Sequence, residues 1–306
     1  PSTAANSRVV AIGREAKQML GRTPENIAVV HPIQCGSITN FPLAESLFRE
    51  CVQRAMAIKP LMKPRMVVCV PLGISDVEQR AIADFARAAG AKEVALVGKS
   101  TAAAVGTDLP IELPKAHVIV DIGGGSTEIA VISMGSLIAG STLPVGGDSF
   151  DQSITEWVQR ELGVLIGEST AEEIKHVVGC AYVPDTPSDS AHVPSGKFNG
   201  RDDATGIPRS FELTRIQARE ALNTPLVAIV EELRRVLSSL TPELAGDIAA
   251  QGVILSGGSS LLPEMPNYLR RVTGLAISMA DDPMRATVTG AGRLLDNSEL
   301  LARVRL

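Results

Sequence analysis

The segment VIVDIGGGSTEIAVISMG, residues 118–135, constrains the fold more than any other part of the chain. An apolar run ends at Asp121, three glycines follow, and an alternating apolar segment resumes directly after them. This pattern predicts two strands joined by a glycine turn, and LIAGSTLPV can pair back as a third strand after the turn at residues 134–136. A Rossmann fingerprint requires a helix after its glycines, so the meander disfavours a dinucleotide-binding fold.

Composition places the chain among ordinary globular proteins. Its 306 residues suggest about two domains, and the aromatic content of 3% requires an aliphatic, alanine-rich core. A net charge of -5 without a basic stripe argues against a nucleic-acid partner. We find no apolar run of about 18 residues and no signal peptide, and the four cysteines are scattered, which fits a reducing cytoplasm.

The rest of the chain predicts alternating helices and strands. A strand over 65–73, a helix with the capping pair Ser75 and Glu78 that ends at Gly90, and a strand over 93–98 form a parallel crossover unit. Residues 183–210 predict a loop or a small irregular β region, and residues 252–274 predict a strand, a glycine turn and a helix. Further helices are expected over residues 41–57, 147–163, 169–179, 213–222, 225–240 and 286–295.

The turn DIGGGST, residues 121–127, has two interpretations. Gly123, Gly124 and Gly125 let the backbone approach a ligand and point successive N–H groups at an anion, as in a phosphate-binding turn. A carboxylate at Asp121 beside phosphates requires a cation between them, which suggests Mg²⁺ held through waters, while Ser126 and Thr127 can donate hydroxyl hydrogen bonds. The alternative is a simple hairpin turn.

A second glycine turn, LSGGSS at residues 255–260, also follows an apolar strand and opens a predicted helix, whose N-terminus favours anions. By itself this turn is equally consistent with an ordinary strand-to-helix connection. Two such turns about 130 residues apart suggest two half-sites around one nucleotide.

Together, VDIGGGSTEIAVIS and ILSGGSSLL resemble the actin, sugar-kinase and chaperone ATPase superfamily. More narrowly, the chain resembles the MreB family of bacterial actin-like proteins through AKQMLGRTPENIAVVHPIQCGSI, VCVPLGISDVEQRAIADFARAAGAKEV, VGGDSFDQSI, GVLIGESTAEEIKH and GIPRSFEL, which occur in the family's order. The resemblance implies an α/β, actin-like two-lobed ATPase fold, with mixed sheets flanked by helices. It also implies four parts: residues 1–42, a small subdomain of lobe I; 43–110 with 281–306, the core of lobe I; 111–149 with 214–280, the core of lobe II; and 150–213, a small subdomain of lobe II.

The resemblance also implies a nucleotide site for ATP and Mg²⁺. The residues that match the second phosphate loop, the helix beside the ribose and adenine, and the adenosine motif are, in that order, Asp121, Gly123, Gly124, Gly125 and Ser126; Glu172, Glu173 and Lys175; and Gly257, Gly258, Ser259 and Ser260. Without the resemblance, Glu172 and Lys175 form only an i,i+3 pair on a solvated helix face.

The loop PLMKPR, residues 60–65, resembles the segment of the family that dips into the inner leaflet of the membrane. Leu61 and Met62 form its apolar tip, and the basic Lys59, Lys63 and Arg65 flank the tip, which suits an anionic lipid surface. The alternative is a linker whose leucine and methionine pack inward.

Two features depart from the family pattern. We find no match to the family's first glycine-bearing phosphate loop, so we expect an incomplete first lobe, either in a truncated chain or with the gap filled by a partner or by the chain's own tail. In addition, Lys99 stands where the family has its catalytic glutamate. A charged lysine cannot accept a proton from water and would point a cation at the γ-phosphate, or it would simply face solvent. Ser126 and Thr127 remain as the candidate catalytic set, so we expect weak or absent hydrolysis.

The leading hypothesis is therefore an MreB-like cytoskeletal protein that binds ATP and forms or joins membrane-associated filaments for cell shape or intracellular organisation. Its partners would be itself, in a head-to-tail protofilament, or a complete MreB, at the inner membrane surface, without nucleic acid. Its place would be cytoplasmic, peripheral to the inner face of the membrane. The second hypothesis is a non-hydrolysing pseudo-ATPase that regulates or co-assembles with a complete MreB. A metabolic kinase or phosphatase of the same superfamily is the third, and GESTAEEIKH argues against it.

Overall fold

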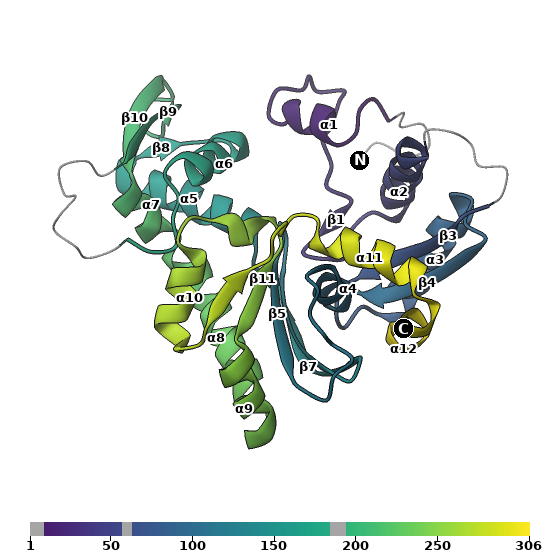
Figure 1. Cartoon of the computed structure of the whole chain (residues 1–306). Coiled ribbons are helices and arrows are strands. Elements are labelled where there is room, and N and C mark those ends of the chain that lie inside the picture. Colours follow the sequence, from purple (N-terminus) through teal and green to yellow (C-terminus); the bar gives the residue numbers. More distant parts are fainter. Residues whose placement is uncertain (1–8, 57–62, 184–193) are drawn as a thin grey trace.

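The computed structural model describes residues 9–56, 63–183 and 194–306, which form two lobes (Figure 1). The elements of the first lobe come from both ends of the chain: α1 (Arg14–Gln18), β1 (Ile33–Gln34), β2 (Ser37–Ile38), α2 (Phe41–Ala55), β3 (Arg65–Val70), α3 (Asp76–Ala88), β4 (Glu93–Gly98), α4 (Lys99–Gly106), α11 (Ala286–Asp296) and α12 (Ser298–Val304). The second lobe holds the middle of the chain. The division of each lobe into a core and a small subdomain, at the residue bounds given above, stays a prediction.

The crossover unit predicted in the first lobe is confirmed. β3 and β4 pair in parallel from Arg65 opposite Glu93 to Val70 opposite Gly98, with α3 between them along the chain. The Ser75 side chain caps α3 at the backbone of Glu78, whose carboxylate accepts a hydrogen bond from the Ser75 backbone. β3 ends at Val70, three residues earlier than predicted, because Pro71 has no N–H to continue the ladder.

The second lobe is built on a five-stranded mixed sheet. The strands run in the order β12, β11, β5, β6, β7, with the first three parallel and the last three an antiparallel meander. Asp121 lies opposite Glu128 in the register of β5 and β6, so their side chains share one face of the sheet. The strands are β5 (His117–Ile122), β6 (Thr127–Ser133), β7 (Ser136–Leu143), β11 (Val253–Ser256) and β12 (Ile277–Met279).

The smaller region of the second lobe is more regular than predicted. Instead of a loop or an irregular β region, a seven-pair hairpin joins β9 (Ser195–Asp202) to β10 (Pro208–Thr214), and β8 (Val164–Leu165) pairs with β9. Phe198 and Phe211 face each other across the hairpin with ring centroids 6.0 Å apart and lie buried. Two alternating strands with one aromatic residue each therefore cover the helices α5 (Gly147–Leu162) and α6 (Glu168–Val177).

One helical prediction needs correction, and four of the described helices were not predicted. The second glycine turn opens a short 3₁₀ helix, η3 (Gly258–Leu261), and the α-helix α10 (Met265–Thr273) begins only after Pro263 and Glu264. The helices α1, α4, α9 (Pro242–Gln251) and α12 were not predicted. The predicted pair over 213–222 and 225–240 is present as α7 (Arg215–Ala221) and α8 (Asn223–Ser238).

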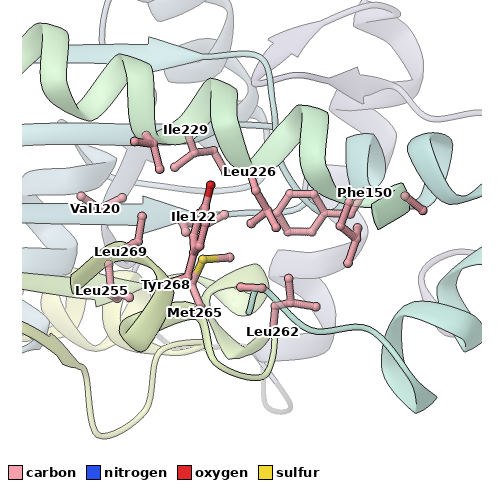
Figure 2. Packing of buried hydrophobic residues seen from close by; sticks show 14 of the residues in the cluster. Val120, Ile122, Phe150, Leu226, Ile229, Leu255, Leu262, Met265, Tyr268 and Leu269 are labelled. Carbon is pink, nitrogen blue, oxygen red and sulfur yellow. The ribbon is translucent and has the colours of Figure 1, made fainter. Parts of the chain in front are cut away.

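The strands β5 and β6 of the meander are buried on both faces, which explains their unbroken apolar runs. On one face, Val120 and Ile122 pack against Phe150 of α5 and against α8 and α10, as Figure 2 shows. On the other face, Ile119 and Ile132 join a second cluster that contains residues of α4 and α11. The sheet of the second lobe therefore packs directly on the helices of the first.

Candidate functional site

The first glycine turn closes tightly between β5 and β6. The N–H of Gly123 donates to the carbonyl oxygen of Ser126 at 2.9 Å, and Ile122 pairs with Thr127 directly below. Within the described part of the chain, the N–H groups of Gly124 and Gly125 donate to no protein acceptor. Gly124 is exposed, so its N–H group is accessible to an anion from solution, whereas Gly125 is half-buried against the backbone of Cys35.

The structure brings the second glycine turn against the first. The hydroxyl of Ser259 donates to the carbonyl oxygen of Gly123 at 2.8 Å, and the buried hydroxyl of Ser260 donates to that of Gly257. Gly257 has a φ of +84°, and a methyl group there would lie 2.5 Å from Asp121 Oδ1. Only glycine permits this approach, so the two turns share one wall of the site.

A third glycine-containing segment, Gly146 and Gly147, supports the same wall and was not predicted from the sequence as part of the site. The N–H groups of Gly147 and Asp148, at the start of α5, donate to the carbonyl oxygens of Gly123 and Gly124 at 3.0 and 2.8 Å. A methyl group on Gly146 would lie 2.5 Å from the carbonyl oxygen of Gly124. The signal was present in VGGDSF, where a glycine pair directly precedes a helix.

The three predicted residues of α6 have different surroundings. Lys175 donates to the carbonyl oxygen of Gly147 at 3.0 Å and to Asp151 Oδ2 at 2.8 Å, so this one of the three residues lies beside the glycine turns. Burial raises the pKa of Asp151, and the hydrogen bond from Lys175 only partly offsets this. Lys175 therefore fastens α6 to α5, and Glu173 is exposed.

Glu172 lies farther out and reaches the other lobe. Its Oε1 is 2.6 Å from Nζ of Lys17 in α1, and the side chains are 27% and 58% exposed. Burial raises the pKa of Glu172, but the hydrogen bond and charge of Lys17 outweigh burial, so the pKa lies below its usual range. α1 and α6 occupy the same end of the two lobes (Figure 1), and this exposed ion pair links them.

Lys99 crosses between the lobes at the floor of the site. It is the first residue of α4, and its Nζ lies 2.9 Å from Asp121 Oδ2, with side-chain exposures of 26% and 2%. The other oxygen of Asp121 accepts the Ser256 hydroxyl at 3.0 Å. Burial lowers the pKa of Lys99, but Asp121 and Glu128 together outweigh this and leave the pKa above its ordinary value.

A second carboxylate, not anticipated from the sequence, lies beside this pair. Glu128 is fully buried, and its Oε2 accepts a short hydrogen bond from the hydroxyl of Ser100, the second residue of α4. Burial raises the pKa of Glu128, and the charge of Lys99 counteracts the rise. Burial also raises the pKa of Cys69 on β3 to about 11.

The two candidate catalytic hydroxyls differ in what they contact. Thr127 is fully buried, and its Oγ1 donates to the carbonyl oxygen of Val145 at 2.7 Å, so it ties the turn to the segment before α5. Ser126 is 6% exposed at the end of the turn, and the tip of the β1–β2 hairpin approaches it: a methyl group on Gly36 would lie 3.7 Å from Ser126 Oγ. The hydroxyl of Thr127 is already bonded to Val145, so Ser126 is the remaining candidate of the two.

The residues around Asp121 do not fit a magnesium ion. Mg²⁺ requires carboxylate oxygens or their bound waters. Oδ1 of Asp121 accepts the Ser256 hydroxyl, and Oδ2, which is buried without a hydrogen-bond partner among the described residues, already has a cation beside it, the ammonium group of Lys99 at 2.9 Å. Within residues 9–56, 63–183 and 194–306 there is no cluster of three or more His, Cys, Asp or Glu side chains able to hold a metal.

The predicted membrane tip, Leu61 and Met62, lies outside the described residues. The basic Lys63 and Arg65, which follow the tip, are exposed. Among the described helices, none has the length and apolarity needed to span a bilayer.

Comparison with known proteins identifies the family. The model of the MreB/Mbl protein family matches residues 2–303. The chain is 42% identical over 291 residues to the cell shape-determining protein MreB of Escherichia coli K12, an alignment that covers 94% of this chain and 82% of the relative. The chain belongs to the MreB/Mbl family.

Solved structures agree with this MreB/Mbl assignment. MreB5 of Spiroplasma citri bound to AMPPNP is 28% identical and superposes with a TM-score of 0.88, covering 95% of this chain and 85% of that chain; its ADP-bound form gives a TM-score of 0.87. The MamK double helical filament, at 20% identity and a TM-score of 0.72 over 87% of this chain and 80% of that one, shares the fold. The actin-like two-lobed fold predicted from the sequence is confirmed.

Proposed function

We propose that this MreB/Mbl protein is cytoskeletal, that it binds ATP or ADP where its three glycine-containing segments meet, and that it forms or joins membrane-associated filaments. One observation carries the nucleotide part: the Ser259 hydroxyl joins the second glycine turn to the carbonyl oxygen of Gly123, beside the free N–H groups of Gly124 and Gly125. Phosphate groups suit such N–H groups, and the relatives bound to ADP and AMPPNP support a nucleotide ligand.

Slow hydrolysis is part of the proposal. Lys99 stands where the resemblance implies a glutamate that would orient water, and its charged ammonium group offers donors but no acceptor. The Thr127 hydroxyl already donates to the carbonyl oxygen of Val145, so Ser126 has the hydroxyl that remains beside the turn. We expect phosphate release from ATP to be near background under conditions in which ATP is bound.

The test of nucleotide binding uses two glycines at which an added methyl group would make only ordinary van der Waals contacts. A methyl group at Gly124 or Gly258 would come no closer than 3.8 Å to its neighbours, so Gly124→Val and Gly258→Val should fold normally while they crowd the phosphates. Gly292→Val is the matched control, because Gly292 is an exposed glycine of α11 without neighbours within 4 Å.

We expect ATP in Mg²⁺ buffer to raise the melting temperature of the wild-type protein and of Gly292→Val. At a ligand concentration about 100 times Kd, the stabilisation is about 2.7 kcal/mol. Both cleft variants should lose most of this shift. No shift in the wild-type protein at millimolar ATP and ADP would refute nucleotide binding.

Filament formation is supported by the family and by the MamK filament that shares the fold. A head-to-tail contact joins two different surfaces and so generates an open polymer. We expect the purified chain to sediment as filaments with ATP and lipid vesicles. Sedimentation only together with a complete MreB would favour the second candidate, a non-hydrolysing pseudo-ATPase that co-assembles, which the Lys99–Asp121 ion pair also favours.

Membrane association rests on the resemblance of residues 60–65. The exposed charges of Lys63 and Arg65 support it, because basic residues next to an apolar tip bind anionic lipid. The purified protein should then co-sediment with vesicles rich in anionic lipid, and a double variant that carries Leu61→Ser and Met62→Ser should not. Equal sedimentation of the wild-type protein and the double variant would contradict a membrane role for the tip.

A further inference from the structure

The floor of the candidate nucleotide site carries a positive charge that belongs to the protein itself. Lys99 Nζ lies 2.9 Å from Asp121 Oδ2 and only 3.2 Å from the position that a methyl group on Gly123 would occupy. The ammonium group therefore contacts the acidic residue and borders the glycine turn at the same time. A metal ion between this carboxylate and a phosphate would have to occupy the same place.

We propose that the Lys99 ammonium group is the cation of this site, so that the phosphates of the nucleotide bind without Mg²⁺. The inference rests on the proposed nucleotide function and concerns what neutralises the phosphates. It makes Lys99 a phosphate-binding residue rather than a solvent-facing remnant of a catalytic position.

The charges around Lys99 support this assignment. Asp121 and Glu128 lie opposite each other on neighbouring strands, and both are buried. A phosphate brought to the glycine turn would face two carboxylates if no cation lay between. Lys99 supplies that cation, and its pKa stays above its ordinary value because the two carboxylates outweigh the effect of burial. The lysine is therefore charged at neutral pH.

The position of Lys99 is also fixed rather than chosen from many rotamers. It is the first residue of α4, and the next residue, Ser100, donates its hydroxyl to Glu128. Two successive side chains of α4 thus reach two successive strands of the other lobe. A positive group held in this way loses little further conformational entropy when a phosphate arrives.

The experiment compares ATP binding in excess Mg²⁺ with ATP binding in EDTA, by equilibrium titration of the full chain. We expect the Kd of the wild-type protein to differ by less than about threefold between the two buffers. For Lys99→Met we expect at least about tenfold weaker binding in EDTA, with partial recovery in Mg²⁺, because Asp121 is then free to hold hydrated metal. Lys92→Met, an exposed lysine of the same lobe, is the control and should behave as the wild-type protein.

Two further variants keep the test decisive if Lys99→Met folds poorly. Lys99→Arg retains the charge and should retain binding in EDTA. Asp121→Asn preserves the shape of the side chain and its contact with Ser256, but it removes a negative charge next to the phosphates. It should therefore bind ATP about three- to tenfold more tightly in both buffers, whereas loss of a metal-holding carboxylate would weaken binding in the Mg²⁺ buffer.

The outcomes separate this inference from the proposed function. Wild-type binding that weakens tenfold or more in EDTA overturns the inference and leaves nucleotide binding intact. Unchanged binding by Lys99→Met in EDTA, or weaker binding by Asp121→Asn, overturns it as well. Absence of binding in both buffers overturns the proposed function, and the inference falls with it.

Discussion

Replacing Gly290 by alanine should destabilise the protein strongly, although alanine is the better helix former. Gly290 lies in α11 where it crosses α4, and an added methyl group would overlap the carbonyl oxygen of Ala102, 2.7 Å from its carbonyl carbon and 2.8 Å from the Gly106 nitrogen. Ordinary contacts begin near 3.4 Å. All three atoms belong to the backbone of α4, so no side-chain rotation can relieve the overlap, and the helices must move apart.

The expected cost follows from opposing terms. Alanine in place of glycine in a helix stabilises by about 1 kcal/mol. Overpacking in a well-packed core costs about 1–3 kcal/mol when side chains can yield, and more when backbone must move. Separation of α4 from α11 also opens the cluster that contains Ala102, Ala286 and Leu294. We therefore expect the free energy of unfolding to fall by about 3 kcal/mol or more.

Gly292 supplies the matched control, because it lies in the same helix, is exposed, and has no atom within 4 Å of an added methyl group. Gly292→Ala should raise the free energy of unfolding by about 0.5–1 kcal/mol. Urea denaturation of both variants, monitored by circular dichroism, measures the difference in the free energy of unfolding, provided that the m-value is the same in both. A loss of less than 1 kcal/mol in Gly290→Ala would refute the close packing of α4 on α11.

Three further predictions concern the charged and thiol groups. Iodoacetamide at pH 8 should label the exposed Cys35 and Cys51 in the native protein and spare Cys69 and Cys180, which mass spectrometry will count. Burial raises the pKa of the Cys69 thiol from 9.0 to about 11, so the unfolded chain loses this proton at a lower pH than the folded protein. The free energy of unfolding should therefore fall by about 2–3 kcal/mol as the pH rises from 9 through 11. In urea titrations over this pH range, Cys69→Ala should lack this part of the decline. Lys175→Met should cost about 3 kcal/mol because it leaves Asp151 buried without its partner, whereas Lys17→Ala should cost no more than about 0.5 kcal/mol because its ion pair with Glu172 is exposed; equal losses in the two variants would contradict these burial assignments.

Local sequence signals predicted much of the fold because several elements are specified by neighbouring residues. β5 and β6 lie on either side of the glycine turn as predicted, since an apolar run on each side of such a turn favours two paired strands. The capping pair Ser75 and Glu78 likewise defines the start of α3. In contrast, α9 buries only Ile248, so its sequence has little helical periodicity, and its start shows only in Thr241 and Pro242. α12 is held by packing of Leu300, Leu301 and Val304 on the second cluster, which no local pattern reveals.

The candidate site divides in the same way. The glycine turns were readable, because glycine itself marks where backbone must approach backbone or ligand. The partners of the charged residues were not readable: Lys17 and Glu172 are 155 positions apart, and Ser256 and Asp121 are 135 apart. The first pair depends on how the two lobes sit together, and the second depends on the pairing of β11 with β5. For the same reason, the sequence placed Lys99 near the γ-phosphate by resemblance but did not predict its ion pair with Asp121.

The α4 helix takes part both in the candidate site and in the packing of the first lobe. Its N-terminus carries Lys99 and Ser100 to Asp121 and Glu128 in the other lobe, and its far end lies against α11 through Gly106 and Gly290. Because α4 has eight residues, a displacement at one end moves the other. A change that separates α4 from α11 should therefore also draw Lys99 away from Asp121. The stability of the first lobe and the charge at the floor of the nucleotide site are thus set by one packing contact.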